Sequence, residues 1–241
     1  MKSFNKGSYH VRIASSKADV RRAQALRHLA FYGRTGRDCD AFDERAHHIL
    51  IETGAGQVVG CFRLMDIADE AQLLASYSAQ FYGLEPLRAQ AGPLLELGRF
   101  CVAPGVRDPD VVRVAWAALT RYVDEKAIKT LFGCASFAGV EPAAHADSMA
   151  LLKARYLGPE ALRPHIKAQA VYRFDEGAEQ ADFRRGLAQM PGLLRSYIAM
   201  GGWVSDHAVI DHDMNRLHVF TALDVARMPE GRKRLLRVSA A

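Results

Sequence analysis

Cysteine is scarce in this chain, and its positions argue against two classes of cross-linked protein. The 241 residues contain four cysteines, and no two of them form a CxxC pair. The composition excludes a disulfide scaffold, and the spacing disfavours a structural zinc site. Cys61 and Cys101 fall in apolar, strand-like runs, so we expect reduced, buried thiols in a cytoplasmic protein.

Long hydrophobic runs are also missing. No segment approaches the roughly 20 consecutive apolar residues that a membrane span needs, and residues 1–16 have no apolar segment of the length found in secretory signals. Hydrophobic residues make up 49% of the chain and charged residues 24%, which excludes disorder. The length allows one large domain or two smaller ones.

Several catalytic and cofactor motifs are absent. No GxGxxG follows the first predicted strand, so a Rossmann fold fits poorly. No HExxH is present, and we place Asp206-His207 and Asp211-His212-Asp213 in a late polar loop without predicting a metal there. Ser136 lacks the GxSxG elbow of a serine hydrolase.

The net charge is +5 and the sequence pI is about 9.1. A basic protein favours an anionic partner, which leaves nucleic acid, an anionic lipid surface and an acidic protein open. No nucleic-acid-binding motif is evident and no aromatic ladder accompanies the basic residues, so we predict no nucleic-acid partner.

The hydrophobic patterning predicts a mixed α/β (α+β) fold with one central sheet. A capping box at Ser16 and Asp19 opens a helix that runs to about Tyr32. Further helices are expected from Asp108, from Asp147 and within 190–202, and the basic residues 231–241 are expected to be frayed. The predicted strands are 10–15, 47–53, 57–66, 93–104, 130–139, 167–174 and 217–225.

Three carboxylates lie close together in the polar segment at Asp38, Asp40 and Asp43. The segment is either a solvated acidic loop or a group of carboxylates that binds a cation, whether arginines of the fold or an amine substrate. A calcium or magnesium site is disfavoured because no EF-hand spacing follows.

Two arginines interrupt apolar strands, Arg63 in GCFRLM and Arg99 in ELGRFCV. A buried arginine needs a carboxylate partner, because an isolated buried charge is strongly disfavoured. Asp40, Asp43 and Glu96 are the candidate partners. The arginines then form an internal salt-bridge network, or one of them binds a substrate carboxylate bidentately. The two interpretations are compatible with each other.

Glu96 lies in the middle of the longest apolar strand, where a carboxylate can serve as a general base. Burial raises the pKa of such a carboxyl unless an arginine offsets it. Strict alternation along a strand places Glu96 and Arg99 on opposite faces. Gly98 lies between them, and we predict a bulge there that brings both side chains to one face.

These motifs together resemble the N-acyltransferases of ornithine lipid biosynthesis and, more distantly, the acyl-homoserine lactone synthases and the GNAT acyltransferases. The resemblance covers about residues 10–175 and returns at 193–225. It rests on LRHLAFYG (26–33), DCDAFDERAHHILIE (38–52), VVGCFRLM (58–65), LLELGRFCVAPGVRDPDVVRVAWAAL (94–119) and LFGCASF (131–137).

The resemblance implies a single GNAT-like domain over 1–241, with a core at about 10–175 and a C-terminal extension at about 176–241. Helices would flank its mixed central sheet, whose fourth and fifth strands would splay apart to hold a pantetheine arm. The implied activity is transfer of a 3-hydroxyacyl chain from acyl carrier protein to the α-amine of L-ornithine by direct aminolysis, giving lyso-ornithine lipid.

The family's motifs match this chain residue by residue. The matches are Arg27 and Phe31 in the first helix, Asp40 and Asp43 in the acidic loop, Arg63 in the third strand, and Glu96 and Arg99 in the fourth. The lactone synthases carry a tryptophan before the acidic pair, whereas GRTGRDC (33–39) has none. APGVRDPD (103–110) does not reproduce the Q/RxxGxG/A pyrophosphate loop, which disfavours coenzyme A and agrees with a carrier-protein donor and no further cofactor.

The resemblance also supplies candidate roles. Glu96 would deprotonate the amine, and a backbone N–H near Phe100 to Val102 would stabilise the oxyanion. Ordinary core packing is the alternative for any of the aromatic residues that we assign to the acyl and pantetheine site. The predicted site residues are Phe31, Phe62, Phe100, Cys101, Val102, Trp116, Ser136 and Phe137, with Phe132 also available.

The basic charge then has a candidate partner in the acidic carrier protein, although solvated helix charges are the alternative. We also expect transient contact of the basic C-terminus with anionic lipid, which would place the protein peripherally at the inner face of the cytoplasmic membrane. Two other functions remain open: a synthase that acylates another amine, as in N-acyl amino acid or lactone synthesis, and a non-catalytic acyl-binding module. The candidate docking residues are Arg107, Arg113, Arg121, Lys126 and Lys129.

Overall fold

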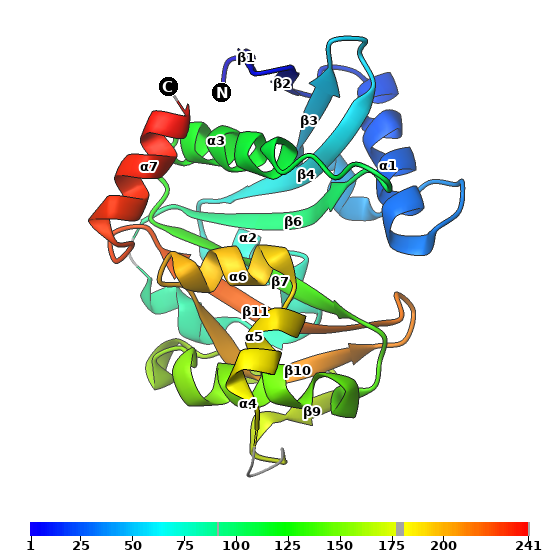
Figure 1. Ribbon diagram of the computed structural model, residues 1–241. Coiled ribbons are helices and arrows are strands. Elements are labelled where there is room, and N and C mark those ends of the chain that lie inside the picture. The colour runs from blue at the N-terminus through cyan, green and yellow to red at the C-terminus, as the bar shows by residue number, and fades with distance from the viewer. Residues whose placement is uncertain (91, 177–180, 241) are drawn as a thin grey trace. The chain divides into compact units, whose positions relative to one another are not determined.

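Strands and helices alternate along the chain, which divides into two compact units (Figure 1). The computed structural model describes residues 1–90, 92–176 and 181–240. The first unit contains Met1–Asp66, Leu95–Ile128 and the residues from Glu230 onward, and the second contains Ile67–Leu94 and Lys129–Pro229. The mixed α/β class is confirmed, and the single domain with a boundary near residue 175 stays a prediction.

The sheet strands of the first unit follow the order β1-β2-β3-β4-β6. The predicted hairpin is present, with β3 and β4 antiparallel and Ile49 opposite Phe62. Alternation along β4 turns Cys61 and Arg63 to one face of the sheet and Phe62 to the other. The strands are β1 (Phe4–Lys6), β2 (Tyr9–Ile13), β3 (His47–Thr53), β4 (Val58–Ile67) and β6 (Leu94–Val102).

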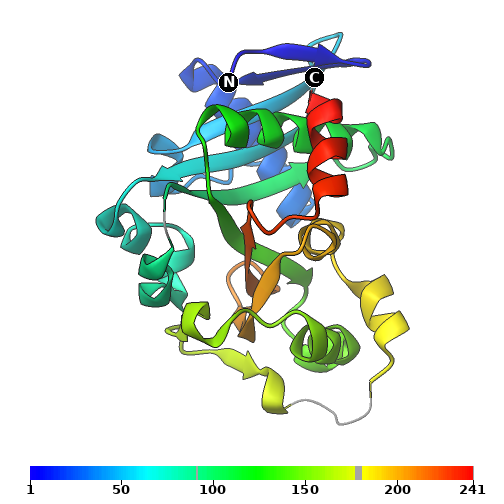
Figure 2. The same cartoon turned by 90° about the vertical axis from the view of Figure 1, so that its left-hand side faces the viewer.

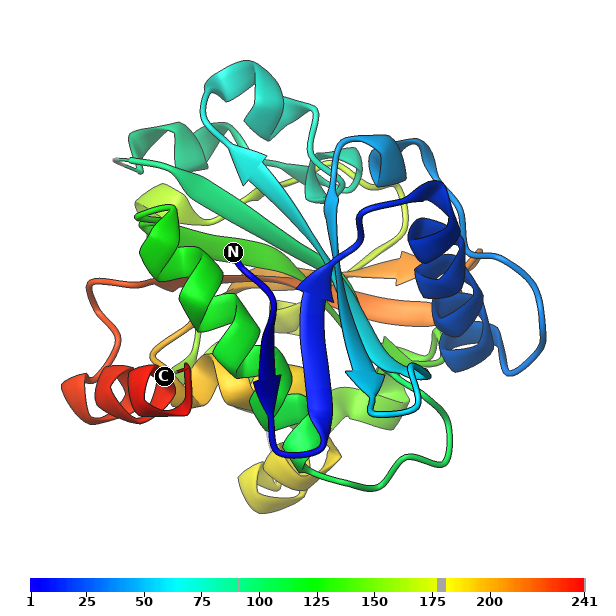
Figure 3. The same cartoon turned by 90° about the horizontal axis from the view of Figure 1, so that it is seen from above.

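Helices α1 (Lys17–Tyr32) and α3 (Asp110–Glu125) lie on opposite faces of this sheet (Figure 3). The Ser16 side chain accepts a hydrogen bond from the Asp19 N–H, as predicted, and Gly33 ends α1 in a left-handed conformation with φ of 68°. The α1 face of the sheet carries a small apolar cluster of Ala23, Leu26, Leu50, Cys61 and Cys101.

The C-terminal residues form helix α7 (Glu230–Ala240), so the prediction of a frayed end is wrong. Arg237 Nη2 lies 3.1 Å from Asp124 Oδ1, and Arg121 Nε donates to the Ala240 carbonyl. These contacts with α3 order a segment that local sequence alone leaves polar and basic. Helix α7 therefore packs along α3 within the first unit (Figure 1).

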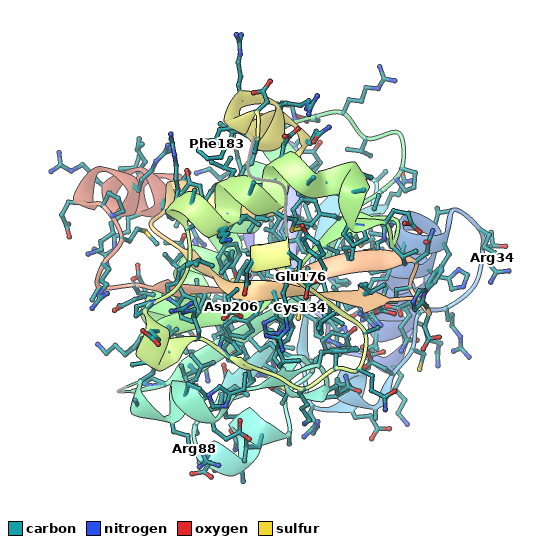
Figure 4. The ribbon with its side chains drawn as sticks, turned by 90° about the horizontal axis from the view of Figure 1, so that it is seen from below. Arg34, Arg88, Cys134, Glu176, Phe183 and Asp206 are labelled. Atoms are coloured by element: carbon teal, nitrogen blue, oxygen red, sulfur yellow. The ribbon has the colours of Figure 1, made fainter. Side chains whose placement is uncertain are left out.

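The sheet of the second unit has the strand order β7-β11-β10-β9, and β5 pairs with β8 apart from it. Helices α4 and α6 lie on one side of the strands in Figure 2. In Figure 4, Phe183 of helix α5 lies above the sheet that carries Asp206. The strands are β5 (Tyr82–Gly83), β7 (Thr130–Ala138), β8 (His165–Ile166), β9 (Val171–Arg173), β10 (Trp203–Asp211) and β11 (Arg216–Asp224). The helices are α2 (Glu70–Leu74), α4 (Ala146–Arg155), α5 (Phe183–Gln189) and α6 (Gly192–Ala199).

The polar loop predicted around Asp206 and His207 is wrong, because both residues belong to β10. The register of β10 against β11 shifts between Val204 and Ala208, which breaks the alternation that sequence reasoning needs. His207 is fully buried there, and its Nδ1 lies 2.8 Å from Asp206 Oδ1.

Strands β6 and β7 correspond to the predicted strands 93–104 and 130–139 and belong to different units. The predicted divergence of these two strands stays a prediction.

Candidate functional site

Arg27 of α1 is the centre of a group of buried charges in the first unit, with 1% of its surface exposed. Its Nε lies 2.8 Å from Asp38 Oδ2, and its Nη1 and Nη2 lie 2.8 and 2.9 Å from the two carboxylate oxygens of Asp43. Its Nη2 also donates to the Asp38 carbonyl. This guanidinium therefore ties both ends of the acidic loop to α1.

The acidic loop folds so that its carboxylates converge. Asp40 caps the short helical turn Ala41–Glu44, and its Oδ1 accepts a hydrogen bond of 2.9 Å from the Phe42 N–H. Asp43 completes a capping box in that turn. This local geometry aims Asp40 and Asp43 toward the sheet, where strand arginines lie.

Both arginines of the apolar strands have aspartate partners. Arg63 Nη1 lies 2.5 Å from Asp40 Oδ1 and 2.9 Å from Asp43 Oδ1. Arg99 Nε lies 3.0 Å from Asp38 Oδ2, and its Nη2 lies 3.2 Å from Asp40 Oδ2. We call this group the buried ionic cluster; it consists of Arg27, Asp38, Asp40, Asp43, Arg63 and Arg99.

The cluster balances its charges, with three arginines against three aspartates. Burial alone raises the pKa of the Asp43 carboxyl, but hydrogen bonds from Arg27 and Gln24 and the nearby arginine charges outweigh it and hold that pKa well below its usual range. Burial lowers the pKa of the neighbouring His48. The Asp43 carboxyl is therefore ionised at neutral pH, beside the guanidinium of Arg27.

Exposure rises from the centre of the cluster to one edge. The side chain of Arg63 is 5% exposed, that of Arg99 is 11% exposed and that of Asp40 is 21% exposed. Arg99 and Asp40 are thus the members that a ligand can reach first. Together they offer a guanidinium for a carboxylate and a carboxylate for an ammonium group, which suits a zwitterionic ligand.

Glu96 lies three residues before Arg99 on β6 and is 4% exposed. The strand is irregular close to the predicted point, because Arg99 has a positive φ of 53°. The irregularity lies at Arg99, the residue after Gly98, and a left-handed residue there interrupts the pleat. A shared face for the Glu96 and Arg99 side chains stays a prediction.

The residues predicted for the acyl and pantetheine site do not share one face. Phe62 and Phe100 stack with ring centroids 5.7 Å apart. Cys101 points to the opposite face, where its Sγ lies 3.5 Å from Cys61 Sγ, because neighbouring strand residues alternate. Phe31 packs against the same cluster as Cys101.

The other predicted members of that site are more widely distributed. Trp116 is half-buried on α3, and Val102 is half-buried at the end of β6. Ser136 and Phe137 belong to β7 of the second unit, where Ser136 is exposed and Phe137 is buried in the core that α4 covers. Their roles toward an acyl chain stay predictions.

The predicted basic docking patch is only partly available. Arg121 lies over the Phe4 ring at 3.9 Å and bonds to α7, so it is a packing residue. Arg113 pairs with Asp110 at 2.6 Å, and Lys126 Nζ lies 3.7 Å from Asp66. Arg107 is exposed, and Lys129 is exposed in the second unit.

The sequence did not identify two residues that bond to the cluster, and it did not identify the ion pairs of a third residue, Asp38. Gln24 Nε2 donates to Asp43 Oδ2 at 2.9 Å, and His48 Nε2 lies 3.0 Å from the Asp43 carbonyl oxygen. Gln24 lies one turn before Arg27 on α1, a spacing that could have identified it. Asp38 was seen only as part of the acidic segment, although it pairs with two arginines.

Among the described residues, no group of three or more His, Cys, Asp or Glu side chains is arranged to hold a metal ion. Within the same residues, no helix combines the length and the apolar character needed to cross a bilayer.

Comparisons with known proteins address the family directly. The profile described as "Acetyltransferase (GNAT) domain" matches residues 24–117, which include all six residues of the buried ionic cluster and Glu96. The solved acyl-homoserine lactone synthase BjaI aligns at 14% identity with a TM-score of 0.49, over 93% of this chain and 83% of that chain.

Curated relatives match over nearly the whole chain. The L-ornithine N(alpha)-acyltransferase of Rhodobacter capsulatus is 34% identical, and the alignment covers 92% of this chain and 92% of the relative. The protein of the same name from Brucella abortus is also 34% identical, over 92% of this chain and 86% of the relative. The chain therefore belongs to the L-ornithine N(alpha)-acyltransferase family and is a GNAT-like N-acyltransferase.

Proposed function

We propose that this enzyme moves a 3-hydroxyacyl chain from its thioester on acyl carrier protein to the α-amine of L-ornithine, giving lyso-ornithine lipid. The names of the curated relatives support the acceptor. One structural observation carries the proposal: Arg99, which pairs with Asp40 at the more exposed edge of the buried ionic cluster, lies on β6 three residues after the buried Glu96.

The members of the cluster have two different functions, positioning of the acidic loop and binding of the substrate. The guanidinium of Arg27 is fully paired with Asp38 and Asp43, so Arg27 positions the loop and does not contact the substrate. Arg99 binds the ornithine carboxylate, because a planar guanidinium matches a carboxylate bidentately. Asp40 binds an ammonium group of the same molecule.

Glu96 acts as the base. The α-ammonium group loses a proton to the Glu96 carboxylate, and the free amine attacks the thioester carbonyl. A backbone N–H between Phe100 and Val102 donates to the oxyanion that develops. The C–N bond forms and the C–S bond breaks, and the pantetheine sulfur leaves with the proton that the attacking nitrogen gives up as it becomes the amide. Glu96 releases the first proton to solvent.

The donor is the acyl-phosphopantetheine of a carrier protein, and the reaction uses no other cofactor. The segment 103–110 lacks the pyrophosphate loop that coenzyme A recognition in this superfamily uses. The exposed Arg107 and the net charge of +5 favour an acidic carrier protein. Because the product is an amphiphile, the enzyme works peripherally at the inner face of the cytoplasmic membrane.

A competition assay tests this function. The purified chain is incubated with 3-hydroxyacyl carrier protein and a panel of amino acids, and products are identified by mass spectrometry. We expect N-acylornithine as the dominant product, and a slower reaction with the matching coenzyme A thioester. A product formed only with another amine identifies a different synthase, and no product with any acceptor identifies an acyl-binding module. A faster reaction with the coenzyme A thioester rules out carrier dependence.

A further inference from the structure

We propose that the outward face of helix α7 is a docking surface for an anionic lipid bilayer. This surface is defined by Arg232, Arg234, Leu235 and Val238, and it deepens the proposed function by assigning the membrane contact to particular side chains. It lies in the first unit and is separate from the buried ionic cluster (Figure 1).

The inner side of α7 is fixed to its own unit. The Ala240 carbonyl accepts from Arg121, and Arg237 is paired with Asp124. The Lys233 side chain is 16% exposed and its Nζ lies 2.7 Å from Glu230 Oε1. The contacts with Arg121 and Asp124 hold the helix in one orientation against α3, so its other side faces solvent.

That other side carries the most exposed large apolar side chains of the described residues. Leu235 is 62% exposed and Val238 is 68% exposed, whereas the other large hydrophobics that reach the surface are 36–44% exposed. Residues three apart share one face of a helix, so the two side chains form a continuous apolar stripe. Packing within the described chain does not explain this stripe.

Arginines flank the stripe on both sides. Arg232 precedes Leu235 by one turn and Arg234 adjoins it, and both are exposed. Helix α7 carries four basic residues and one acidic residue. An apolar stripe bordered by arginines matches the boundary between anionic headgroups and acyl chains, where a helix lies in the plane of the membrane.

The position of the apolar side chains favours a bilayer over an acidic carrier protein. Leu235 and Val238 lie at the centre of the exposed face with the charges at its borders, as in interfacial helices. The proposed product is a lipid, which has to leave the enzyme for a bilayer. No helix of the described residues crosses a membrane, so this contact is peripheral.

Vesicle sedimentation of the full chain tests the docking surface without requiring catalysis. The probes are vesicles of phosphatidylcholine alone and of phosphatidylcholine with phosphatidylglycerol. We expect binding to the anionic vesicles that weakens with added salt, and little binding to the neutral ones. No binding to anionic vesicles, or equal binding to both kinds, overturns the proposal.

Variants locate the surface. We expect Leu235→Ser with Val238→Ser, and separately Arg232→Gln with Arg234→Gln, to lower the partition coefficient about tenfold or more. The matched control is Arg184→Gln with Leu187→Ser on α5, which removes the same residue types from the second unit and is expected to bind normally. Equal loss in the control overturns the assignment to α7.

Acyl transfer with soluble donor and ornithine separates the two proposals. The α7 variants are expected to keep normal turnover and a normal KM for the carrier protein. A raised KM for the carrier protein with unchanged vesicle binding shows that α7 docks the carrier protein, and the membrane proposal then fails. Absence of acylornithine from the unsubstituted chain rejects the proposed function and leaves the vesicle result as it stands.

Discussion

Two groups of arginine and carboxylate side chains each include residues of helix α1, and they differ in burial. The buried ionic cluster joins α1 to the acidic loop, β4 and β6. A second group, the outer ionic cluster, joins the start of α1 to β2 and β3. The outer ionic cluster consists of Arg12, Asp19, Arg22 and Glu52.

The outer ionic cluster is open to water through its arginines. The side chains of Arg12 and Arg22 are 22% and 39% exposed, although Arg12 holds Asp19 at 2.7 Å through two hydrogen bonds. Hydrogen bonding by Arg12 holds the pKa of the Asp19 carboxyl well below its usual range. These pairs tie the helix to the sheet.

The difference shows how burial changes the consequence of the same pairing. Where water reaches the arginines, loss of one partner leaves a group that water can solvate. In the buried ionic cluster, loss of one partner leaves charges that nothing solvates, so the whole assembly keeps one geometry. We therefore expect the buried ionic cluster to hold its geometry more rigidly than the outer ionic cluster.

The largest expected effect is a difference in kcat between substitutions of two buried glutamates of the first unit. Glu96 is 4% exposed and Glu52 is 6% exposed, and both lie on strands. If Glu96 is the base, Glu96→Gln lowers kcat by roughly 10²- to 10⁴-fold while circular dichroism shows a folded protein. Glu52→Gln, the matched control, is expected to reduce stability and leave kcat near normal. Near-normal turnover of Glu96→Gln shows that another group takes the proton.

The second prediction compares one arginine from each cluster. Arg27→Leu removes the central cation and leaves buried aspartates without their partner, so we expect a loss of about 3–5 kcal/mol in the free energy of unfolding. Arg12→Leu is expected to cost only about 1 kcal/mol, because water screens its site. Denaturant unfolding measures both values. Equal losses would show that burial does not distinguish the two clusters.

A third prediction concerns the pH dependence of stability and compares both clusters with His218, a buried side chain outside them. In the second unit, the Tyr82 hydroxyl donates to the His218 carbonyl at 2.8 Å and lies 3.1 Å from His218 Nδ1. Burial lowers the pKa of His218 to about 4. His218 takes up a proton below about pH 6.5 in the unfolded chain but only near pH 4 in the folded chain. The free energy of unfolding therefore falls as the pH drops from about 6.5 toward 4.

The expected loss over that window is about 3 kcal/mol from His218, with none above pH 7. Unfolding curves at pH 7.5 and pH 4.5 measure it, in a range where ordinary aspartates remain ionised. His218→Gln should flatten the dependence, while Asp19→Asn should leave it unchanged. An unchanged slope in His218→Gln assigns the effect to His48 or His207, whose pKa values burial also lowers.

The smallest effect concerns the reachable edge of the buried ionic cluster. Asp40→Asn keeps the size of the side chain and removes the charge offered to an ammonium group. We expect KM for ornithine to rise about tenfold with little change in kcat, since one charge-assisted hydrogen bond contributes roughly 1.5 kcal/mol. Asp19→Asn is the control from the outer ionic cluster and should leave KM unchanged. A rise in KM for the acyl donor instead would move Asp40 out of the acceptor site.

Several elements could be read directly from local sequence. Ser16 caps α1, and Gly33 ends it, because each of these positions has a backbone requirement that few residues meet. The pairing of Arg63 with Asp40 and Asp43 was predictable, because an arginine within an apolar strand needs a carboxylate. Arg99 needed the same reasoning, but its partners are Asp38 and Asp40.

Other features depended on information that no short segment holds. The bulge in β10 that buries His207 follows from the register with β11. The helix at Glu230–Ala240 depends on contacts with α3, more than a hundred residues away in sequence. Cys101 and Phe100 lie on opposite faces of β6, as strand alternation predicts, and their assignment to the acyl and pantetheine site stays a prediction.

The amino-acid sequence by itself determined the family, the mixed α/β class and the need for buried ion pairs, because each of these follows from residue type and local order. Only the tertiary structure decided which carboxylate meets which arginine, which cluster water can reach, and which side of α7 is left uncovered. These outcomes depend on distances between segments that are far apart in the chain. Where such segments come together, the degree of burial determines how strongly each charge interacts with its partner.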